Sequence, residues 1–316
     1  MVDLKLEIPE GFLQEEIRCG YTVSKQMKEI WAVELDLFAE FDRVCRKHGI
    51  TYIASGGTML GTVRHHGFIP WDDDIDLMMM RDQYEKLCNV AEDEFKHPYF
   101  FQSEKTEPGF RRRFAKLRNT ETTAIQEREI TLHPKYNQGI FIDIFPLDGV
   151  PDNEKEYYHQ YNLFCFYRKL YYRFLSMENL IYYDDDPMAK KMLKKAAHLF
   201  LGAPARALHL TDWAYKKVET VCKSHTDQET KLISLLSFQF ENLGHALRRS
   251  DMDNIIEMDF EFLKMPVTAN YDEHLRRKYG DYMTPAKDPS YHGDLIFDTN
   301  IGYVAYYQQH QELLRK

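Results

Sequence analysis

The sequence predicts a protein of the α/β or α+β class, in which a core of strands and helices carries a helical insertion. Three observations support this prediction. Short β-branched and aromatic segments alternate with amphipathic segments over residues 1–150, a pattern typical of strands alternating with helices. Helix formers and aromatic residues dominate residues 153–247, where strand signals are weak. Strand-like sequence then returns at 254–267.

The first elements are defined by their periodicity and by the residues that end them. Residues 22–48 carry an apolar stripe at helical spacing. Lys47 and His48 suit the last turn of this helix, and Gly49 suits its stop. Residues 50–54 are β-branched and aromatic, which predicts a buried strand. A glycine turn and a short helix follow this strand.

Further elements are expected along the rest of the chain. The expected strands are residues 74–79, 110–118 and 139–145, and the expected helices are residues 83–95 and 271–279. An irregular tail follows. The chain is thereby divided into a core at 1–151, a helical insertion at 152–250 and a C-terminal segment at 251–316 that completes the core.

Composition excludes several classes of protein. The chain has 316 residues with 41 Lys+Arg and 50 Asp+Glu, so its formal net charge is −9, which argues against nucleic acid as a partner. The five cysteines are widely spaced, which implies neither a zinc site nor a disulfide framework and favours a reducing, cytoplasmic compartment. The first twenty residues carry charge throughout, so no secretory signal is expected. No apolar run is long enough to span a membrane.

Three carboxylates are the candidate catalytic groups and metal ligands. Asp74 and Asp76 are two residues apart on a predicted strand, so both side chains project from one face. Alternation along the strand at 139–145 places Asp143 on one face between two phenylalanines. Like charges so close repel, and a hard divalent cation such as Mg²⁺ removes the conflict. The sequence therefore predicts a metal site suited to phosphoryl transfer.

A glycine pair precedes the acidic residues. Ser55, Gly56, Gly57 and Thr58 join a predicted strand to a predicted helix. Glycines let backbone amides approach a phosphate closely, and a helix N-terminus favours negative charge. These four residues are expected to contact a phosphate-bearing substrate.

Other interpretations of the acidic run exist. The run Asp72-Asp73-Asp74 is also compatible with a polar turn. An EF-hand is excluded, because a loop starting at Asp72 has Leu77 at its sixth position and Gln83 at its twelfth. An Asp-x-Asp metal site of a glycosyltransferase that uses nucleotide sugars stays open.

A long signature surrounds the glycine pair and the acidic residues: SGGTMLGTVRHHGFIPWDDDIDLMM, residues 55–79. It resembles the signature of the LicD family of phosphocholine transferases, which are related to fukutin proteins within the nucleotidyltransferase superfamily. Two further blocks are similar to the family, FAKLRNTETT with GIFIDIFPLDGVP (114–151) and NYDEHLRRKYGDYMTPAKDPSYHG (270–293). The resemblance implies a nucleotidyltransferase-type mixed β-sheet flanked by helices.

The same resemblance implies a reaction. A CDP-activated alcohol, usually CDP-choline, donates its phospho-alcohol to a hydroxyl of a cell-surface glycan such as a teichoic acid or lipopolysaccharide precursor, and CMP is released. Asp74, Asp76 and Asp143 would hold one or two Mg²⁺ ions, with Mn²⁺ as an alternative. Asp143 would help to deprotonate the acceptor hydroxyl, and Gly57 and Thr58 would contact the diphosphate. A lipid-linked acceptor would bring the protein to the inner face of the cell membrane.

Basic residues are expected to offset the charge of the donor. Arg64 follows the glycines in the predicted helix. Alternation places Lys116 and Arg118 on one face of a predicted strand together with Arg112. Protective charges on an edge strand are the alternative interpretation. His292 is a further candidate for substrate binding, because it closes the last matched block.

A choline headgroup binds over aromatic faces. Tyr279 and Tyr282 are the candidates for such a cage, because they lie in a matched block. The densest aromatic run, residues 157–175, keeps helical spacing and is more typical of a buried core stripe. Arg168 and Lys169 beside these aromatics also suit an anionic membrane surface.

Three other functions compete with phospho-alcohol transfer. A nucleotidyltransferase that uses the same carboxylates on an NTP and a small molecule would release pyrophosphate. A metal-dependent glycosyltransferase would release a nucleoside diphosphate. A non-catalytic relative that binds a glycan is disfavoured, because the three carboxylates and the glycine pair are all present.

Overall fold

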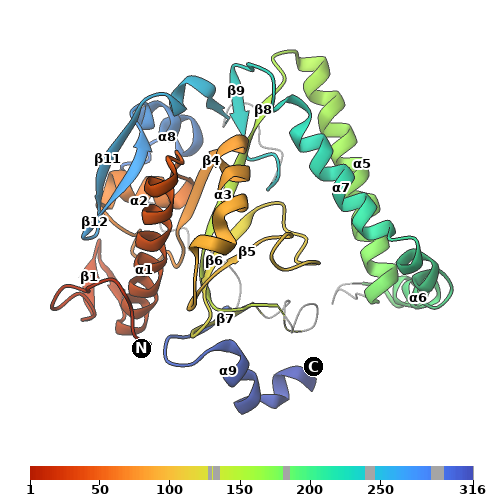
Figure 1. Cartoon of the computed structure of the whole chain (residues 1–316), viewed down its shortest axis with the longest axis horizontal. Helices are drawn as coiled ribbons and strands as arrows, with labels where there is room; N and C mark the ends of the chain where they lie inside the picture. The colour runs from red at the N-terminus through yellow and green to blue at the C-terminus, as the bar shows by residue number, and fades with distance from the viewer. Residues whose placement is uncertain (127–129, 131–135, 181–185, 239–245, 286–294, 316) are drawn as a thin grey trace. The chain divides into compact units, whose positions relative to one another are not determined.

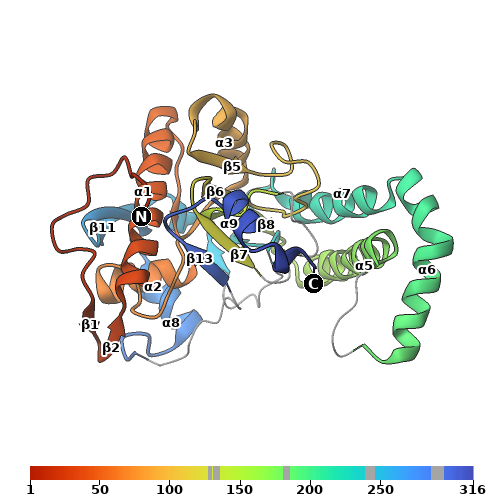
Figure 2. The same ribbon diagram turned by 90° about the horizontal axis from the view of Figure 1, so that it is seen from below.

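The computed structural model describes residues 1–126, 130, 136–180, 186–238, 246–285 and 295–315. It divides the chain into two units, Met1–Leu147 with Glu241–Lys316, and Asp148–Phe240. Figures 1 and 2 show the ribbon from two directions. Each unit is described by itself.

A mixed sheet forms the centre of the first unit (Figure 1). Its strands are β3 (Ile53–Ala54), β4 (Asp76–Met80), β5 (Tyr99–Gln102), β6 (Ala115–Asn119) and β8 (Ile140–Val150). They lie in the order β3-β4-β8-β6-β5, with β4 and β8 parallel and the other pairs antiparallel. The α/β class and the mixed sheet expected from the sequence are therefore confirmed.

The first unit also contains several helices. They are α1 (Lys25–His48), α2 (Gly56–His65), α3 (Arg81–Glu94), α8 (Tyr271–Tyr279) and α9 (Tyr303–Gln309). Helix α1 packs on β6, and α2 and α3 pack on β4. The Ser24 hydroxyl accepts a hydrogen bond from the Met27 amide at 3.2 Å and caps the start of α1. Gly49 ends α1 in a left-handed conformation with φ 57°, so the expected stop is confirmed.

Smaller elements complete the first unit. They are β1 (Glu16–Arg18), β2 (Tyr21–Val23), β7 (Thr123–Gln126), β10 (Leu247–Arg248), β11 (Ile255–Phe260), β12 (Leu263–Thr268) and β13 (Leu295–Asp298), with short 3₁₀ helices at Arg249–Met252 and Gln311–Arg315. The strand-like segment at 254–267 is thus an antiparallel hairpin of β11 and β12. The expectation of an irregular tail is wrong, because β13 pairs with β7 and α9 follows it.

The expected strand at 110–118 is too long. Strand β6 begins at Ala115, so Arg112 lies in irregular backbone and alternation does not place it on a face with Lys116. The carboxylate of Glu104 accepts hydrogen bonds from the amides of Gly109 and Arg111 at 3.0 and 2.6 Å. This side chain therefore satisfies backbone groups that a strand would have used in its ladder.

The second unit is mainly helical. It contains α5 (Glu154–Asn179), α6 (Met188–Ala207), α7 (Leu210–Cys222), a 3₁₀ turn at Lys223–His225 and β9 (Leu232–Ser234), which pairs with the end of β8. A buried cluster joins α5 to α7 through Tyr171, Leu175, Ala214 and Tyr215. Phe164 is also buried, so these members of the aromatic stripe in α5 belong to a core. Among the helices in the described part of the chain, none is long and apolar enough to cross a membrane.

Candidate active site

The site begins at the N-terminus of α2, where glycine is required at two successive positions. Gly56 has φ +47°, a left-handed conformation that L side chains rarely adopt. A Cβ on Gly56 would lie 3.5 Å from Oδ2 of Asp76, so this carboxylate faces the helix start. A Cβ on Gly57 would lie only 2.6 Å from Oδ2 of Asp72. The glycine pair therefore admits two carboxylates to the start of the helix.

Backbone hydrogen bonds tie the start of α2 to the start of β4. The amide of Ser55 donates to the carbonyl of Asp76 at 2.9 Å. The amide of Asp76 in turn donates to the hydroxyl of Thr58 at 2.8 Å. Ser55 and Thr58 are both buried. These two residues of the sequence signature therefore hold the Asp76 backbone beside the glycines.

Asp76 and Asp143 lie side by side across two parallel strands. They are register partners of β4 and β8, and partners in neighbouring strands project to the same face of a sheet. Lys116 of β6 is the antiparallel register partner of Asp143 on its other side. Lys116 Nζ lies 2.6 Å from Oδ1 of Asp143 and 3.3 Å from the centroid of the Phe141 ring. The structure thus brings the three groups Asp76, Asp143 and Lys116 into one row.

The electrostatic environment of Asp143 is set by opposing effects. Burial raises the pKa of the Asp143 carboxyl above its ordinary value, because the charged form loses its hydration. The Lys116 ammonium opposes this rise, and repulsion from Asp74 adds to it. Asp143 is therefore held as a carboxyl whose proton affinity exceeds that of an exposed aspartate.

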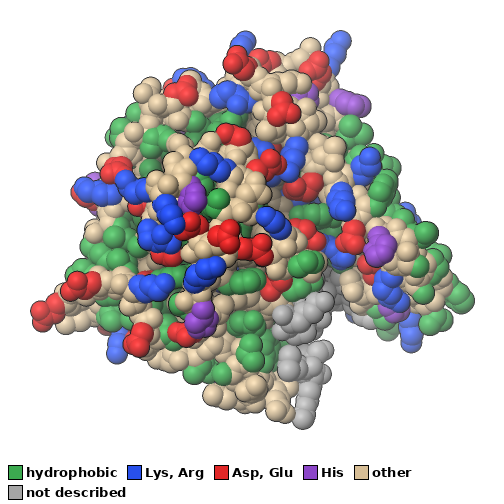
Figure 3. All heavy atoms as spheres, in the orientation of Figure 1, with side chains coloured by type: hydrophobic (Ala, Val, Ile, Leu, Met, Phe, Trp, Pro, Cys, Tyr) green, Lys and Arg blue, Asp and Glu red, His purple; other side chains and the backbone are tan. Residues whose placement is uncertain are grey.

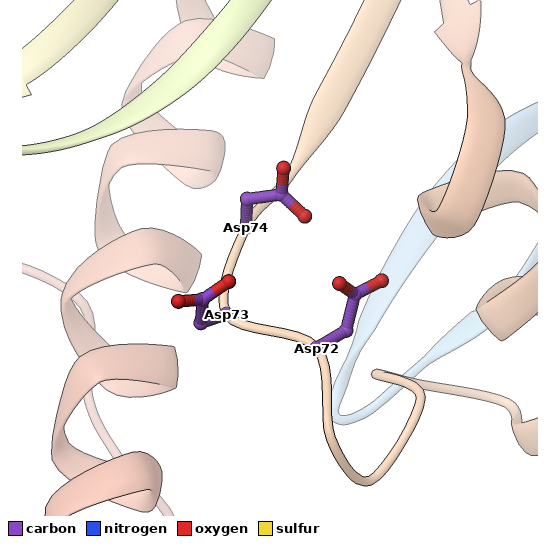
Figure 4. Close-up of side chains that lie close together, drawn as sticks. All are labelled: Asp72, Asp73 and Asp74. Carbon is purple, nitrogen blue, oxygen red and sulfur yellow. The ribbon is translucent and has the colours of Figure 1, made fainter. Parts of the chain in front are cut away.

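Asp74 lies in the loop before β4, with Asp72 and Asp73. The expectation that Asp74 and Asp76 share one strand is wrong, because β4 begins at Asp76. One carboxylate oxygen from each of Asp72, Asp73 and Asp74 lies within 4.8 Å of the others. Figure 4 shows the Asp72 and Asp74 carboxylates on the same side of the loop. Trp31 of α1 donates its indole N–H to the Asp72 carbonyl at 2.9 Å and anchors this loop.

Asp72 and Asp73 are the residues that sequence reasoning missed. The run of three aspartates indicates that they could belong to the site, but such a run is equally typical of a polar turn. Asp72 is buried, and its contact with Gly57 depends on how the loop returns to α2.

These carboxylates fit a hard divalent cation. Each of the groups near the helix start offers charged oxygen ligands, the type that Mg²⁺ prefers. The oxygens of Asp72, Asp73 and Asp74 gather within one small region, and Asp76 and Asp143 are adjacent in register. The donor set therefore suits Mg²⁺ and lacks the thiolate ligands typical of softer ions.

Arg64 occupies the last turn of α2, close to the C-terminal block. Its guanidinium donates to the Tyr282 carbonyl at 2.7 Å and to Nε2 of His65 at 2.9 Å. Burial lowers the pKa of Arg64 from its ordinary value. Burial, and after it the positive charge of Arg64, lowers the pKa of His65 to about 4. Arg64 is thus a partly buried cation one helix length from the glycines.

The two candidate cage tyrosines have different surroundings. Tyr279 ends α8, is 41% exposed, and its hydroxyl lies 4.0 Å from where a Cβ on Gly56 would stand. Tyr282 is buried, and its hydroxyl donates to Asp272 at 2.7 Å. Of the two rings, the structure brings Tyr279 to the start of α2 and packs Tyr282 beneath the surface. His292 lies outside the described residues.

Arg118 is enclosed within the sheet. It is 1% exposed, and its guanidinium lies 4.7 Å from the centroid of the Phe141 ring. It donates to Oε1 of Gln102 at 2.5 Å and to the Gly139 carbonyl at 2.7 Å. In this arrangement the Arg118 side chain braces β5, β6 and the start of β8.

Comparisons with known proteins identify relatives of this chain. The family model described as LicD/FKTN/FKRP, nucleotidyltransferase domain, matches residues 49–178. The lipopolysaccharide cholinephosphotransferase LicD of Haemophilus influenzae is 28% identical over 271 residues, which cover 84% of this chain and 95% of that protein. An uncharacterised protein of Rickettsia prowazekii is 26% identical over 152 residues, covering 48% of this chain and 50% of that protein. The matched domain contains the glycine pair, the acidic loop, β4 and β8, so this part of the chain is similar to the LicD family.

Proposed function

We propose that this protein transfers phosphocholine, or a related phospho-alcohol, from a CDP-activated donor to a hydroxyl of a surface-glycan precursor and releases CMP. The Haemophilus influenzae relative, which is named a lipopolysaccharide cholinephosphotransferase, supports phosphocholine as the group and lipopolysaccharide as the acceptor class. A teichoic acid precursor is the alternative acceptor.

The observation that carries the proposal is the adjacency of Asp76 and Asp143 beside the start of α2. The two carboxylates are register partners, and Asp76 faces Gly56. Amides at a helix start favour an anionic ligand. A diphosphate at the glycines would therefore lie next to both carboxylates.

Asp74, Asp76 and Asp143 would hold Mg²⁺, which neutralises charge on the diphosphate when bound. Asp72 is a further candidate ligand because of its distance to Asp74. The amide of Gly57 would orient the donor phosphates. Arg64, in the last turn of the same helix, would add positive charge near the site.

Asp143 is the residue that would accept the proton of the acceptor hydroxyl. The hydroxyl oxygen forms a bond to the phosphorus that carries the alcohol, and the bond from that phosphorus to the oxygen of CMP breaks. A raised pKa brings a carboxylate closer to the operating pH, which favours its action as a general base. Lys116 bonds to Oδ1, so Oδ2 is the atom assigned to the proton.

Tyr279 is the residue that would contact the choline headgroup. Its ring is partly exposed and its hydroxyl is near Gly56. A quaternary ammonium gains about 0.5–2 kcal/mol over an aromatic face. Tyr279→Leu should therefore weaken binding of CDP-choline more than binding of CMP.

Calorimetric titration of CDP-choline with and without Mg²⁺ tests the donor. Wild type should bind only with Mg²⁺, and Asp74→Ala/Asp76→Ala should lose this binding. Glu92→Ala/Asp93→Ala on α3 removes the same charge from the chain and should bind like wild type. Metal-independent binding, or equal loss in both double variants, would contradict the proposal.

The products distinguish the competing reactions. CMP release with transfer of phosphocholine to a glycan supports the proposal. Pyrophosphate release from an NTP would identify a nucleotidyltransferase, and release of a nucleoside diphosphate would identify a glycosyltransferase. If CDP-choline does not bind, CDP-glycerol and CDP-ribitol are the next donors to titrate.

A further inference from the structure

Helix α6 of the second unit has an unusual charge and exposure pattern. Its sequence, MAKKMLKKAAHLFLGAPARA, contains four lysines, one arginine and no acidic residue, whereas the whole chain carries a formal charge of −9. Only Gly202 and Ala205 of this helix are buried. The helix is therefore a strongly basic element whose apolar side chains remain largely outside the core.

The apolar side chains of α6 form one face. They recur at steps of three and four residues, the spacing that places side chains on one side of a helix. The exposed large members are Met188, Met192, Leu193, Leu199 and Phe200, which are 74, 68, 71, 71 and 73% exposed. Alanines at 189, 196, 203 and 207 are exposed in the same stripe. Figure 3 shows hydrophobic side chains at the surface in the region of α6.

The opposite side of α6 makes the contacts with the rest of its unit. Lys190 and Lys194 form ion pairs with the buried Asp186. Nδ1 of His198 lies 2.7 Å from the Met177 carbonyl of α5. A Cβ on Gly202 would lie 2.6 Å from the same carbonyl, so the two helices approach closely there. Helix α6 is thus attached by its small and polar side, which turns the apolar stripe outward.

This arrangement reverses the usual one. A helix on a globular protein normally buries its apolar stripe and exposes its charges. Single exposed apolar residues are common, but a contiguous apolar face marks an interaction surface. Lys195 lies three residues after Met192 and four before Leu199, so it borders the stripe. Whatever binds this surface must therefore contact an apolar face and carry negative charge beside it.

We propose that α6 is an interfacial helix that lies on an anionic membrane surface. Its apolar stripe would enter the boundary between headgroups and acyl chains, while Lys191 and Lys195 contact lipid phosphates. The helix has 20 residues but carries four lysines and one arginine, and it is not apolar enough to cross a membrane, which agrees with an in-plane orientation. This inference does not depend on which donor the protein uses. It concerns α6, whereas the basic residues that the sequence analysis considered for a membrane surface lie in α5.

Vesicle flotation of the full chain tests the proposal. Wild type should bind vesicles of phosphatidylglycerol and phosphatidylethanolamine, bind pure phosphatidylcholine vesicles weakly, and lose affinity as salt increases. Leu193→Glu/Phe200→Glu should lower the affinity for anionic vesicles roughly tenfold or more, because two apolar side chains no longer enter the interface. Ile17→Glu/Ile256→Glu is the matched control, since these side chains are 78 and 41% exposed on the first unit.

Several outcomes would overturn the proposal. They are the absence of binding to anionic vesicles at low salt, unchanged binding by Leu193→Glu/Phe200→Glu, and an equal loss in the control. A wild-type dimer that this variant converts to monomers, with vesicle binding unchanged, would assign the face to a second copy. Should the variant unfold, Lys191→Glu/Lys195→Glu keeps the apolar face and must still weaken binding. CDP-choline titration of the same variants separates a failure here from a failure of the proposed reaction.

Discussion

Lys116 and Asp143 are register partners on β6 and β8, and Nζ of Lys116 lies 2.6 Å from Oδ1 of Asp143. Their side chains are 8 and 14% exposed. A buried ion pair contributes little compared with a well-packed apolar pair, but removal of one partner leaves a buried charge. This relationship therefore has consequences for stability as well as for the chemistry of Asp143.

Lys116→Met should destabilise the fold by about 3 kcal/mol, because the Asp143 charge stays buried beside it. Asp143→Asn alone should also cost stability. The double variant should cost less than the sum of the two single variants, since neither charge remains. Urea unfolding of the four proteins measures the coupling. Additive effects, within about 0.5 kcal/mol, would show that the two side chains do not interact.

Gly57→Ala should displace the carboxylate of Asp72. The added Cβ would lie 2.6 Å from Oδ2 of Asp72, and Trp31 holds the backbone of Asp72 in place. We expect a loss of about 1–3 kcal/mol in the free energy of unfolding, with weaker Mg²⁺ binding by calorimetry.

The matched control removes the contact itself. In an Asp72→Ala background, Gly57→Ala should cost little further stability, because Oδ2 is no longer present. If Gly57→Ala is equally destabilising in both backgrounds, the contact with Asp72 is not the reason for glycine at this position.

His65 should make stability depend on pH between 6.5 and about 4. Burial and the neighbouring Arg64 lower the pKa of His65 from 6.5 to about 4. Above pH 6.5 the imidazole is neutral in both the folded and the unfolded chain, so it adds no pH dependence. As the pH falls towards 4, the unfolded chain binds the proton first, and stability decreases.

The comparison of His65→Gln with wild type isolates this effect. Chemical denaturation at several pH values should show a shallower loss of stability for His65→Gln over this range. His159→Gln, at an exposed position of α5, is the control and should follow wild type. The assignment fails if His65→Gln loses stability with the same slope as wild type.

Local signals predict where two of the helices end in this chain. The stop of α1 is predicted because Gly49 follows its last helical residue, and the expected end of α8 at residue 279 is likewise followed by a glycine, Gly280; both glycines have positive φ. Alternation along β8 predicts the face of Asp143, because the strand is long and apolar on its other side. These features depend on a few neighbouring residues, which is why sequence alone is sufficient.

Features that depend on distant segments are not predicted in the same way. The adjacency of Asp76 and Asp143 requires β4 and β8 to pair in parallel and in one register, and many residues separate these strands. The contact of Asp72 with Gly57 depends on the path of a loop that Trp31 anchors from α1. The residue types in a sequence can indicate a metal site. Which of these residues lie next to one another can be known only from the tertiary structure.

Arg118→Lys separates a structural role from a role in donor binding. The sequence assigns Arg118 to the substrate, while its guanidinium donates to Gln102 and to the Gly139 carbonyl within the sheet. Lysine keeps the charge but not the planar fork that makes both bonds. Because hydrogen bonds of charged groups contribute about 1.5–3 kcal/mol, we expect a clear loss of stability in urea, with the affinity for CDP-choline unchanged in the folded protein. A variant of wild-type stability that binds CDP-choline tenfold more weakly would instead place Arg118 in the donor site.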